Sequence, residues 1–319
     1  MSTAAADTAY RWHHLRHEDV AAWCALTTTL ATADGTDELY QPEDLAEELD
    51  EHGVDPARDS WAVWHGDQLV AAGQVRVAFH PDQDGRTRVW LGGGVHPEHR
   101  GRGIGRRLLA EQERRGLEIA RARQPGRPVF WRADGGLQGA SVRRLLEHRG
   151  YAVARYFNQM TRALPGPALP APTAHRLVSP GDDLEEALRL AHNLAFRDHW
   201  GSTEQTAQTW HDHWAARSSR PAVSSVALDE HGTPLAYVLC GEWVPRELYV
   251  NLVGTVPSAR GGGLARACLA RTISLAATSG AYDKVDLHVD SASPTGATRL
   301  YETVGFHVDK TFASYQRDA

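Results

Sequence analysis

The chain has 319 residues, a formal net charge of −6 at pH 7 and 42% hydrophobic residues. This length supplies apolar material for two domains of ordinary size, each with its own core, and the acidic balance argues against a general nucleic-acid-binding protein. Cys24, Cys240 and Cys268 are widely separated and have no metal-ligand spacing, and no signal peptide or membrane-spanning run is apparent. We expect a soluble cytoplasmic protein, monomeric or homodimeric, that binds neither nucleic acid nor membrane.

The first half of the chain begins with the pattern of a strand, a helix and a hairpin. Trp12–Arg16 predicts a short strand, and His17–Trp23 has the acidic start and periodicity of a helix. Ser60–Trp64 and Leu69–Val77 predict two strands of a hairpin. A later β-branched run at Pro128–Trp131 predicts a further strand after a long helical pattern.

A proline-rich segment divides the chain. Leu164–Pro172 contains four prolines, so it cannot hold a helix and offers few backbone donors to a sheet. We expect a stiff, extended linker. The predicted organisation is an N-terminal domain at 1–164, a linker at 165–172 and a C-terminal domain at 173–319.

The second half repeats the order of elements found in the first. His175–Ser179 predicts a strand, Asp182–Leu188 a helix, Ser224–Leu228 and Leu235–Leu239 a hairpin, and Lys284–Val289 a later strand. This repetition predicts two α/β domains, each a mixed, mostly antiparallel sheet flanked by helices.

A glycine-rich loop occupies the same place in each half. Arg100–Gly105 and Arg260–Ala265 both follow an apolar run and precede a helical pattern. Glycine lets a ligand approach the backbone closely, and the unpaired N–H groups of a helix start attract phosphate. The residues predicted to surround phosphates are Val95, His96, Pro97, Arg100, Gly101, Arg102, Gly103, Ile104, Gly105 and Arg106 in the first copy, and Thr255, Val256, Pro257, Arg260, Gly261, Gly262, Gly263, Leu264, Ala265 and Arg266 in the second.

Neither loop has the Gly-Lys-Ser/Thr of a nucleotide-hydrolysing P-loop. Both instead resemble the acetyl-CoA motif of the GNAT superfamily of acetyltransferases, which reads Gln or Arg, x, x, Gly, x, Gly or Ala. A later family signature, Ala-x-x-x-Tyr-x-x-x-Gly-Phe, is matched by Ala297–Phe306, with Pro294 where the family usually has Asn. The resemblance implies two tandem GNAT-like domains that use acetyl-CoA as a cosubstrate and no metal.

The tyrosine of that signature, Tyr301, is the predicted general acid. A phenol with a pKa of about 10 is protonated at neutral pH and can donate to a departing thiolate. Its alternative role is helix packing beside Leu300. The matching position of the first copy, within Ser141–Tyr151, is Leu146, which has no proton to donate. We therefore expect catalysis in the C-terminal domain, and ligand binding without turnover in the N-terminal one.

The predicted general base is Glu247. The family often places a carboxylate eleven residues before the first Gln or Arg of the loop, and Tyr249 stands there. Glu247 lies two residues earlier on the same strand face, so a bulge in the strand is needed to bring it to the amine. A solvated carboxylate at the strand edge is an equal alternative, and Glu242 and Asn251 are weaker candidates.

Aromatic and titratable residues gather at 196–201 and 210–214, where the resemblance to tandem GNAT proteins implies substrate recognition. We predict that His199, Trp200 and Asn251 contact the substrate. His211 and His213 are two residues apart and do not share a helix face, so a metal site is not expected.

Three functions follow from these observations. The first is an acetyl-CoA-dependent N-acetyltransferase of a small-molecule primary amine. The second is a non-catalytic protein that binds or senses acyl-CoA. The third is an acetyltransferase of protein amino groups.

Overall fold

The structure, a computed structural model, describes residues 10–197, 199–200, 202–293 and 296–319. The chain forms two compact units. The first unit contains the described part of residues 1–154 together with residues 313–319, and the second unit contains residues 155–312. The C-terminal residues of the chain therefore belong to the unit that contains its beginning.

The sheet of the first unit runs in the order β1-β2-β3-β4-β5, and the end of β12 adds a sixth strand. Its strands are β1 (Arg11–His13), β2 (Ser60–His65), β3 (Gln68–Val77), β4 (Thr87–Val95), β5 (Val129–Asp134) and β12 (His307–Asp318). Strands β4 and β5 are parallel and the other neighbours are antiparallel. The parallel pair arises because a helix, α4 (Ile104–Arg123), connects the two strands as a crossover.

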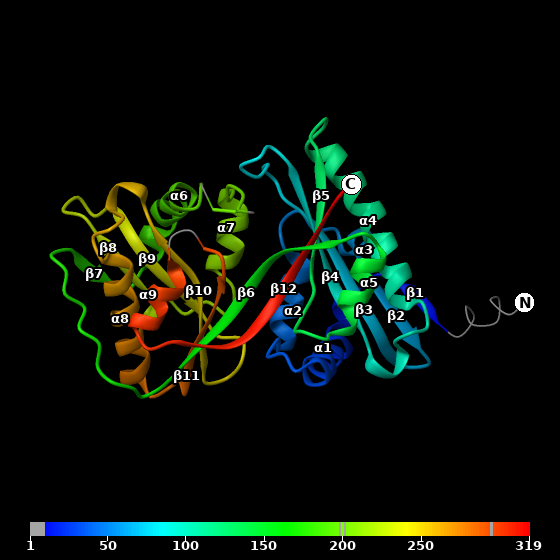
Figure 1. Cartoon of the computed structure of the whole chain (residues 1–319), viewed down its shortest axis with the longest axis horizontal. Helices are drawn as coiled ribbons and strands as arrows, with labels where there is room; N and C mark the ends of the chain where they lie inside the picture. Colours follow the sequence, from blue (N-terminus) through cyan, green and yellow to red (C-terminus); the bar gives the residue numbers. More distant parts are fainter. Residues whose placement is uncertain (1–9, 198, 201, 294–295) are drawn as a thin grey trace, which may run out of the picture. The chain divides into compact units, whose positions relative to one another are not determined.

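The sheet of the second unit has the same pattern, in the order β7-β8-β9-β10-β11-β6 (Figure 1). Its strands are β6 (Ala152–Ala163), β7 (Arg176–Val178), β8 (Ser225–Leu228), β9 (Pro234–Gly241), β10 (Glu247–Thr255) and β11 (Lys284–Asp290). Strands β10 and β11 are parallel, with α8 (Leu264–Ser279) as their crossover, and the other neighbours are antiparallel. The two halves of the sequence thus build two sheets of equivalent topology.

Each sheet receives its sixth strand from the other half of the sequence. Residues 157–163 of β6, which ends the first half, pair with β11 of the second unit. Residues 314–318 of β12, which ends the second half, pair with β5 of the first unit. The halves therefore exchange their final strands, and the first unit ends at residue 154, ahead of the proline-rich segment.

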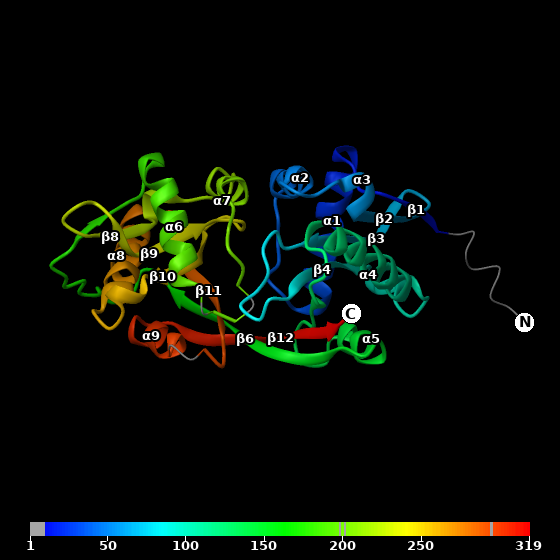
Figure 2. The same ribbon diagram turned by 90° about the horizontal axis from the view of Figure 1, so that it is seen from above.

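Helices cover both faces of each sheet (Figures 1 and 2). In the first unit these are α1 (Val20–Asp34), α2 (Pro42–Asp50), α3 (Pro56–Asp59), α4 and α5 (Ser141–His148), and in the second unit α6 (Glu185–Ala195), α7 (Ala207–Trp214), α8 and α9 (Ala297–Thr303). Successive side chains of β9 point to opposite faces of the sheet and enter different cores. Ala236 and Val238 pack in the core that contains α8, whereas Tyr237 packs with α6 and α7. We call these sides the α8 face and the α6 face.

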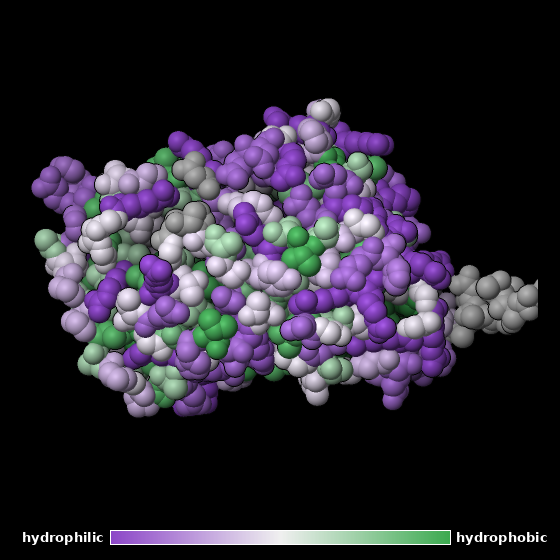
Figure 3. Space-filling view, viewed as in Figure 1, coloured by the Kyte–Doolittle hydropathy of each residue, from purple (hydrophilic) through white to green (hydrophobic). Residues whose placement is uncertain are grey.

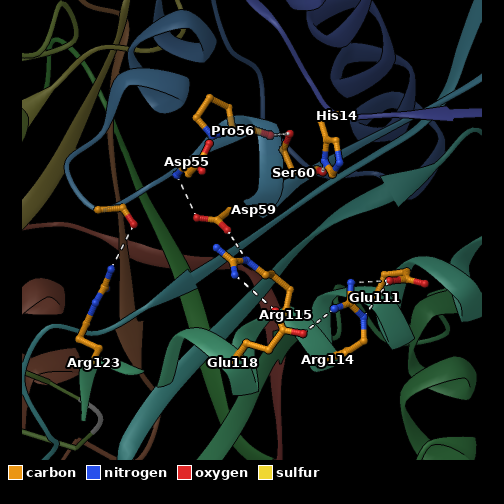
Figure 4. A network of polar contacts seen from close by, with 11 residues as sticks. His14, Asp55, Pro56, Asp59, Ser60, Glu111, Arg114, Arg115, Glu118 and Arg123 are labelled. Carbon is orange, nitrogen blue, oxygen red and sulfur yellow. Dashed lines mark hydrogen bonds and ion pairs between the residues drawn. The ribbon is translucent and has the colours of Figure 1, made fainter. Parts of the chain in front are cut away.

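A nearly buried ion pair joins α3 to α4 in the first unit (Figure 4). The Nε of Arg115 lies 2.7 Å from Oδ1 of Asp59, and the two side chains are 13% and 4% exposed. The other carboxylate oxygen of Asp59 accepts a hydrogen bond from the backbone N–H of Asp55 at 2.9 Å. The Asp59 carboxylate therefore depends on Arg115 for its compensating charge.

We expect Arg115→Ala to destabilise the first unit by about 3 kcal/mol, because it removes the cation that contacts the buried Asp59 carboxylate. Arg114→Ala is the matched control. Arg114 is the preceding residue on the same helix, its side chain is 60% exposed, and its pairs with Glu111 and Glu118 lie at the surface, so the expected loss is below about 1 kcal/mol. Urea unfolding followed by tryptophan fluorescence measures both, and equal losses in the two variants would contradict the assigned role of Arg115.

The surface in the view of Figure 3 is mainly hydrophilic, with apolar side chains in small separate patches. Exposed large apolar residues of the described chain include Val153, Tyr156 and Val308 on β6 and β12, and Leu190 and Leu194 on α6. Among the described residues, no helix combines the length and the apolar character needed to cross a membrane.

The predicted fold class, two tandem α/β units with mixed, mostly antiparallel sheets, is confirmed. Both predicted hairpins are present as β2–β3 and β8–β9. The proline-rich segment contains neither helix nor strand, as expected. However, it packs within the second unit, where Leu164 joins the core and the carbonyl oxygen of Pro170 accepts a hydrogen bond from Arg266 at 3.0 Å.

Candidate active site

The parallel strands of the second unit separate partway along their length. Pairing of β10 with β11 covers Glu247–Val250 and Lys284–Leu287. Beyond this point β10 continues to Thr255 beside β9, with a bulge between Val250 and Leu252, while β11 continues to Asp290 beside β6. The facing backbone groups beyond the separation point have no ladder partner across the gap, so an extended ligand can take their hydrogen bonds.

The first unit has the same opening. Pairing of β4 with β5 covers Thr87–Leu91 and Val129–Ala133, while β4 continues beside β3 to Val95. Each unit therefore presents a parallel pair of strands that opens toward its glycine loop.

The second loop forms an open turn between β10 and α8. Gly261 and Gly263 have φ angles of +82° and +76°, which residues with side chains rarely adopt. A Cβ placed on either glycine would meet nothing within 4 Å, so the space in front of the backbone is open. Leu264 begins a helix of 16 residues whose first N–H groups face this space. The loop fits a phosphate or pyrophosphate group, which these N–H groups and the helix dipole would hold.

Arginine side chains anchor this loop to the protein. Arg260 donates from Nη2 to the carbonyl oxygen of Ala195, the last residue of α6, at 2.9 Å, and from Nε to the carbonyl oxygen of Thr255 at 3.4 Å. Arg266, on the first turn of α8, donates to Pro170. All three acceptors are neutral carbonyl groups, so these contacts do not cancel the two guanidinium charges.

The first loop has the same backbone and a different charge arrangement. Gly101 and Gly103 have φ angles of +75° and +87°. Arg100 donates to the carbonyl oxygen of Val95 and forms two hydrogen bonds, of 2.7 and 2.6 Å, with the carboxylate of Asp34, the last residue of α1. The carboxylate cancels the charge of Arg100, whereas the equivalent Arg260 binds a carbonyl group.

The remaining residues of the first loop also contact their own surroundings. Arg102 donates to the carbonyl oxygen of Glu98 at 3.1 Å. The ring of His99, which is buried, lies 5.1 and 5.7 Å from those of His65 and His96, and its Nδ1 is 3.0 Å from the hydroxyl of Tyr10. Burial, with the nearby cation Arg102, lowers the pKa of His99.

Tyr301 lies on α9 and is 7% exposed, in the core of the α8 face. Its ring makes an edge contact with Phe306, with 6.0 Å between centroids. Burial raises the pKa of Tyr301 to about 12, so the phenol keeps its proton at neutral pH. Leu146, at the matching position of the first unit, is buried on α5, and its hydrocarbon side chain cannot donate a proton.

Glu247 is the first residue of β10 and is held by a lysine. Its Oε2 lies 3.1 Å from Nζ of Lys284, which also contacts Oδ2 of Asp286 at 2.7 Å. The bulge on which its predicted role depends is present, but it lies four residues later, at Asn251. Glu247 thus remains in the regular part of the ladder, beside Lys284.

The weaker base candidates occupy different surroundings. Glu242 accepts a hydrogen bond from Nε of Arg220 at 2.8 Å and another from the backbone N–H of Arg246 at 3.2 Å. Asn251 is exposed at the bulge, and its amide nitrogen would lie 2.9 Å from a Cβ built on Gly241.

Two of the predicted substrate residues, His199 and Trp200, follow α6. His199 packs on Phe196, with 5.3 Å between ring centroids, and Trp200 lies under the guanidinium of Arg155, 5.0 Å from its Cζ. Arg155 also faces Asp290, with 3.7 Å between Nε and Oδ2. Asp198 and Gly201 of this segment, like Pro294, lie outside the described residues.

The second aromatic segment, on α7, is mainly structural. Trp210 is buried in the core of the α6 face. Trp214 donates to Asp182 at 3.0 Å, and His211 contacts Glu185 at 2.9 Å. The aromatic residues of α7 therefore fasten this helix to the start of α6.

Sequence reasoning missed the aromatic row on the α6 face of β10 and β11. The rings of Trp243, Tyr249, His288 and Phe312 follow one another, with centroids 5.4, 5.8 and 5.2 Å apart. The signal was present in β11, where Asp286, His288 and Asp290 alternate with apolar residues and so share one face. The other three rings of the row come from three different segments of the chain, and the sequence alone does not show that these segments meet.

Comparison with known proteins agrees with this geometry. Residues 13–139 and 185–306 match the family described as Acetyltransferase (GNAT) family, once in each half. The chain is 30% identical over 290 residues to the mycothiol acetyltransferase of Salinispora arenicola, covering 86% of this chain and 88% of that protein. It is 33% identical over 301 residues to the mycothiol acetyltransferase of Thermobispora bispora, covering 90% and 92%.

Solved structures share the fold over nearly the whole chain. A GCN5-related N-acetyltransferase from Sphaerobacter thermophilus superimposes with a TM-score of 0.74 at 24% identity, covering 97% of this chain and 95% of that one. A tandem GNAT protein from the clavulanic acid biosynthesis pathway gives 0.66 at 18% identity, covering 97% and 98%. N-myristoyltransferase of Saccharomyces cerevisiae, solved with bound myristoyl-CoA, gives 0.64 at 11% identity, covering 99% and 80%. The chain therefore belongs to the GNAT family and is an N-acetyltransferase of the tandem type, with one GNAT unit in each half.

Proposed function

We propose that the second unit transfers the acetyl group of acetyl-CoA directly to a primary amine of a small molecule while both substrates are bound. The observation that carries this proposal is the combination, within one unit, of an open glycine loop, a pair of separated strands and a buried phenol. The first unit has the first two features but places Leu146 where the second has Tyr301.

The loop and the strand opening fit the two ends of acetyl-CoA. The N–H groups at the start of α8 suit its pyrophosphate, and the unpaired backbone groups beyond Val250 suit the extended pantetheine arm. Acetyl-CoA supplies an activated thioester. Holding that thioester beside an amine lowers the barrier by roughly 7–11 kcal/mol when the geometry is right, so little covalent chemistry is required of the protein.

Tyr301 supplies the proton that the departing sulfur needs. Since burial raises its pKa to about 12, the hydroxyl remains protonated over the whole physiological range. A phenol can then donate to a thiolate as the carbon–sulfur bond breaks. The acceptor reaches the opposite, α6 face, beside the predicted substrate residues His199, Trp200 and Asn251.

The comparisons support a small-molecule acceptor. The two relatives described above are named mycothiol acetyltransferases, and the chain covers about nine-tenths of each. We propose only that the acceptor carries a primary amino group, because the fold alone does not specify the substrate.

A thiol-release screen tests the proposal. The purified protein is incubated with acetyl-CoA and a panel of aminosugar, amino acid, cysteinyl and alkyl amines, with peptides as a separate arm. We expect amine-dependent release of CoA and mass-spectrometric detection of the N-acetylated amine. Acetyl-CoA binding without release for every acceptor would favour the non-catalytic alternative, and acetylation of peptides in preference to free amines would favour a protein acetyltransferase.

A further inference from the structure

We propose that His288 is the group that removes the proton from the acceptor amine. This inference rests on the proposed function and assigns its missing base. It replaces Glu247, the base expected from the sequence, with a residue of the neighbouring strand.

His288 stands where the two parallel strands separate. The last paired residues are Val250 on β10 and Leu287 on β11, so His288 is the first residue of β11 beyond the ladder on that side. On its other side it remains paired with Gln159 of β6. Its backbone is therefore fixed by one neighbour while the side toward β10 is open, which is where a thioester lying between the strands would end.

The side chain of His288 lies on the face opposite to Tyr301. Leu287 and Val289, its neighbours in sequence, pack in the same core as Tyr301 on the α8 face. By the alternation of a strand, His288 projects to the α6 face, where it is exposed. The two groups thus approach the separated strands from opposite faces, as an amine entering on one side and a sulfur departing on the other require.

Two aromatic contacts orient the imidazole. Its ring makes edge contacts with Tyr249 on β10, at 5.8 Å and 80°, and with Phe312 on β12, at 5.2 Å and 60°. Tyr249 occupies the position where the family often places a carboxylate. The structure therefore puts a titratable ring directly beside that position, on the next strand.

The carboxylates of Glu247, Asp286 and Asp290, on the same face, each contact a cationic side chain. Glu247 and Asp286 share Lys284. Asp290, whose side chain is 4% exposed, faces Arg155 and accepts the backbone N–H of Ala292 at 2.9 Å. Among the titratable groups described on this face, His288 combines exposure with a place at the strand opening.

Imidazole suits the task because its ordinary pKa lies close to neutrality. An alkylamine with a pKa of about 10.4 is free base in only about one molecule per thousand at pH 7. In the proposed step the ammonium gives one proton to His288, the neutral nitrogen bonds to the thioester carbon, and the carbon–sulfur bond breaks. Tyr301 protonates the sulfur and is reprotonated by the second nitrogen proton, and His288 releases its proton to solvent, so the net reaction liberates one proton.

The test compares pH–rate profiles of kcat/KM, using acetyl-CoA and the best amine from the screen. We expect His288→Gln to lose about 100-fold at pH 7 and to keep acetyl-CoA binding within twofold. Its rate should then rise about tenfold per pH unit up to the pKa of the amine, because only amine already deprotonated by solvent reacts. The wild-type rate should level off well below that pKa.

Two variants serve as controls, with circular dichroism and thermal melting to verify folding. His307→Gln removes an exposed histidine from the first residue of β12 and should match the wild type. Glu247→Gln should retain most activity and the wild-type profile. An unchanged profile in His288→Gln, or transfer of its defect to Glu247→Gln, would overturn the assignment of His288 while leaving the proposed function intact. Absence of wild-type turnover with every amine would overturn both.

Discussion

Gly263→Glu is expected to weaken acetyl-CoA binding by about 30-fold or more, equivalent to roughly 2 kcal/mol, and to remove most amine-dependent CoA release. Gly263 has a φ of +76°, so any side chain there is strained. The new carboxylate would also occupy the open space in front of the α8 N–H groups and repel a phosphate. Isothermal titration calorimetry with acetyl-CoA measures the loss directly.

Gly232→Glu is the matched control for this variant. Gly232 has a φ of +83° and the same open surroundings, but it lies in the turn between β8 and β9. The backbone strain is therefore similar, and the proposed phosphate site is untouched. Equal losses of affinity in the two variants would mean that strain rather than site chemistry is responsible.

The same change in the first loop separates the roles of the two units. Gly103→Glu is expected to leave turnover within a few-fold of the wild type. The carboxylate of Asp34 neutralises the charge of Arg100. Leu146, at the position equivalent to Tyr301, cannot donate a proton. Loss of turnover in Gly103→Glu with a normal Gly263→Glu would assign catalysis to the first unit.

Tyr301→Phe is expected to reduce turnover at least about tenfold and to change the Kd of acetyl-CoA by no more than a few-fold. The substitution removes the hydroxyl that we propose protonates the sulfur, and it keeps the ring that packs on Phe306. Steady-state kinetics should therefore show the loss in kcat. Turnover equal to the wild type would refute the role of Tyr301.

Tyr282→Phe is the control for packing effects. Tyr282 is buried to a similar extent in the same core, before the start of β11. If removing any buried hydroxyl from this core slowed the enzyme, Tyr282→Phe would do so too. We expect it to remain within about twofold of the wild type, since conservative changes away from reacting groups have small effects.

The local parts of the fold are readable from the sequence because they depend on neighbouring residues. Gly261 and Gly263 mark a turn with positive φ, and the structure contains that turn immediately before α8. The hairpins follow from alternating apolar residues on either side of short polar turns. The repetition of these signals in the two halves predicts the tandem architecture, which the structure confirms.

The exchange of the final strands was not predictable in this way. Residues 157–163 and 314–318 both have strand character, and local sequence does not specify which sheet edge accepts them. Strand pairing is decided by contacts between segments far apart in the chain. Residue 312 thus faces the site of the second unit, and residue 313 belongs to the first.

The same limitation applies to the candidate site. Tyr301 and the second loop are predicted from their own motifs. The pairing of Glu247 with Lys284, and of Arg100 with Asp34, depends on residues 37 and 66 positions away. His288 is a candidate because it lies where β10 separates from β11. The sequence of β11 alone does not predict where that separation occurs.

A crystal structure of the protein with CoA bound tests the central claim most directly. The account predicts the pyrophosphate at the second loop, with its oxygens about 3 Å from the backbone nitrogens of residues 261–265, and the sulfur between the separated strands within reach of the Tyr301 hydroxyl. A ligand bound away from the second loop, or a Tyr301 hydroxyl directed away from the sulfur, would contradict it.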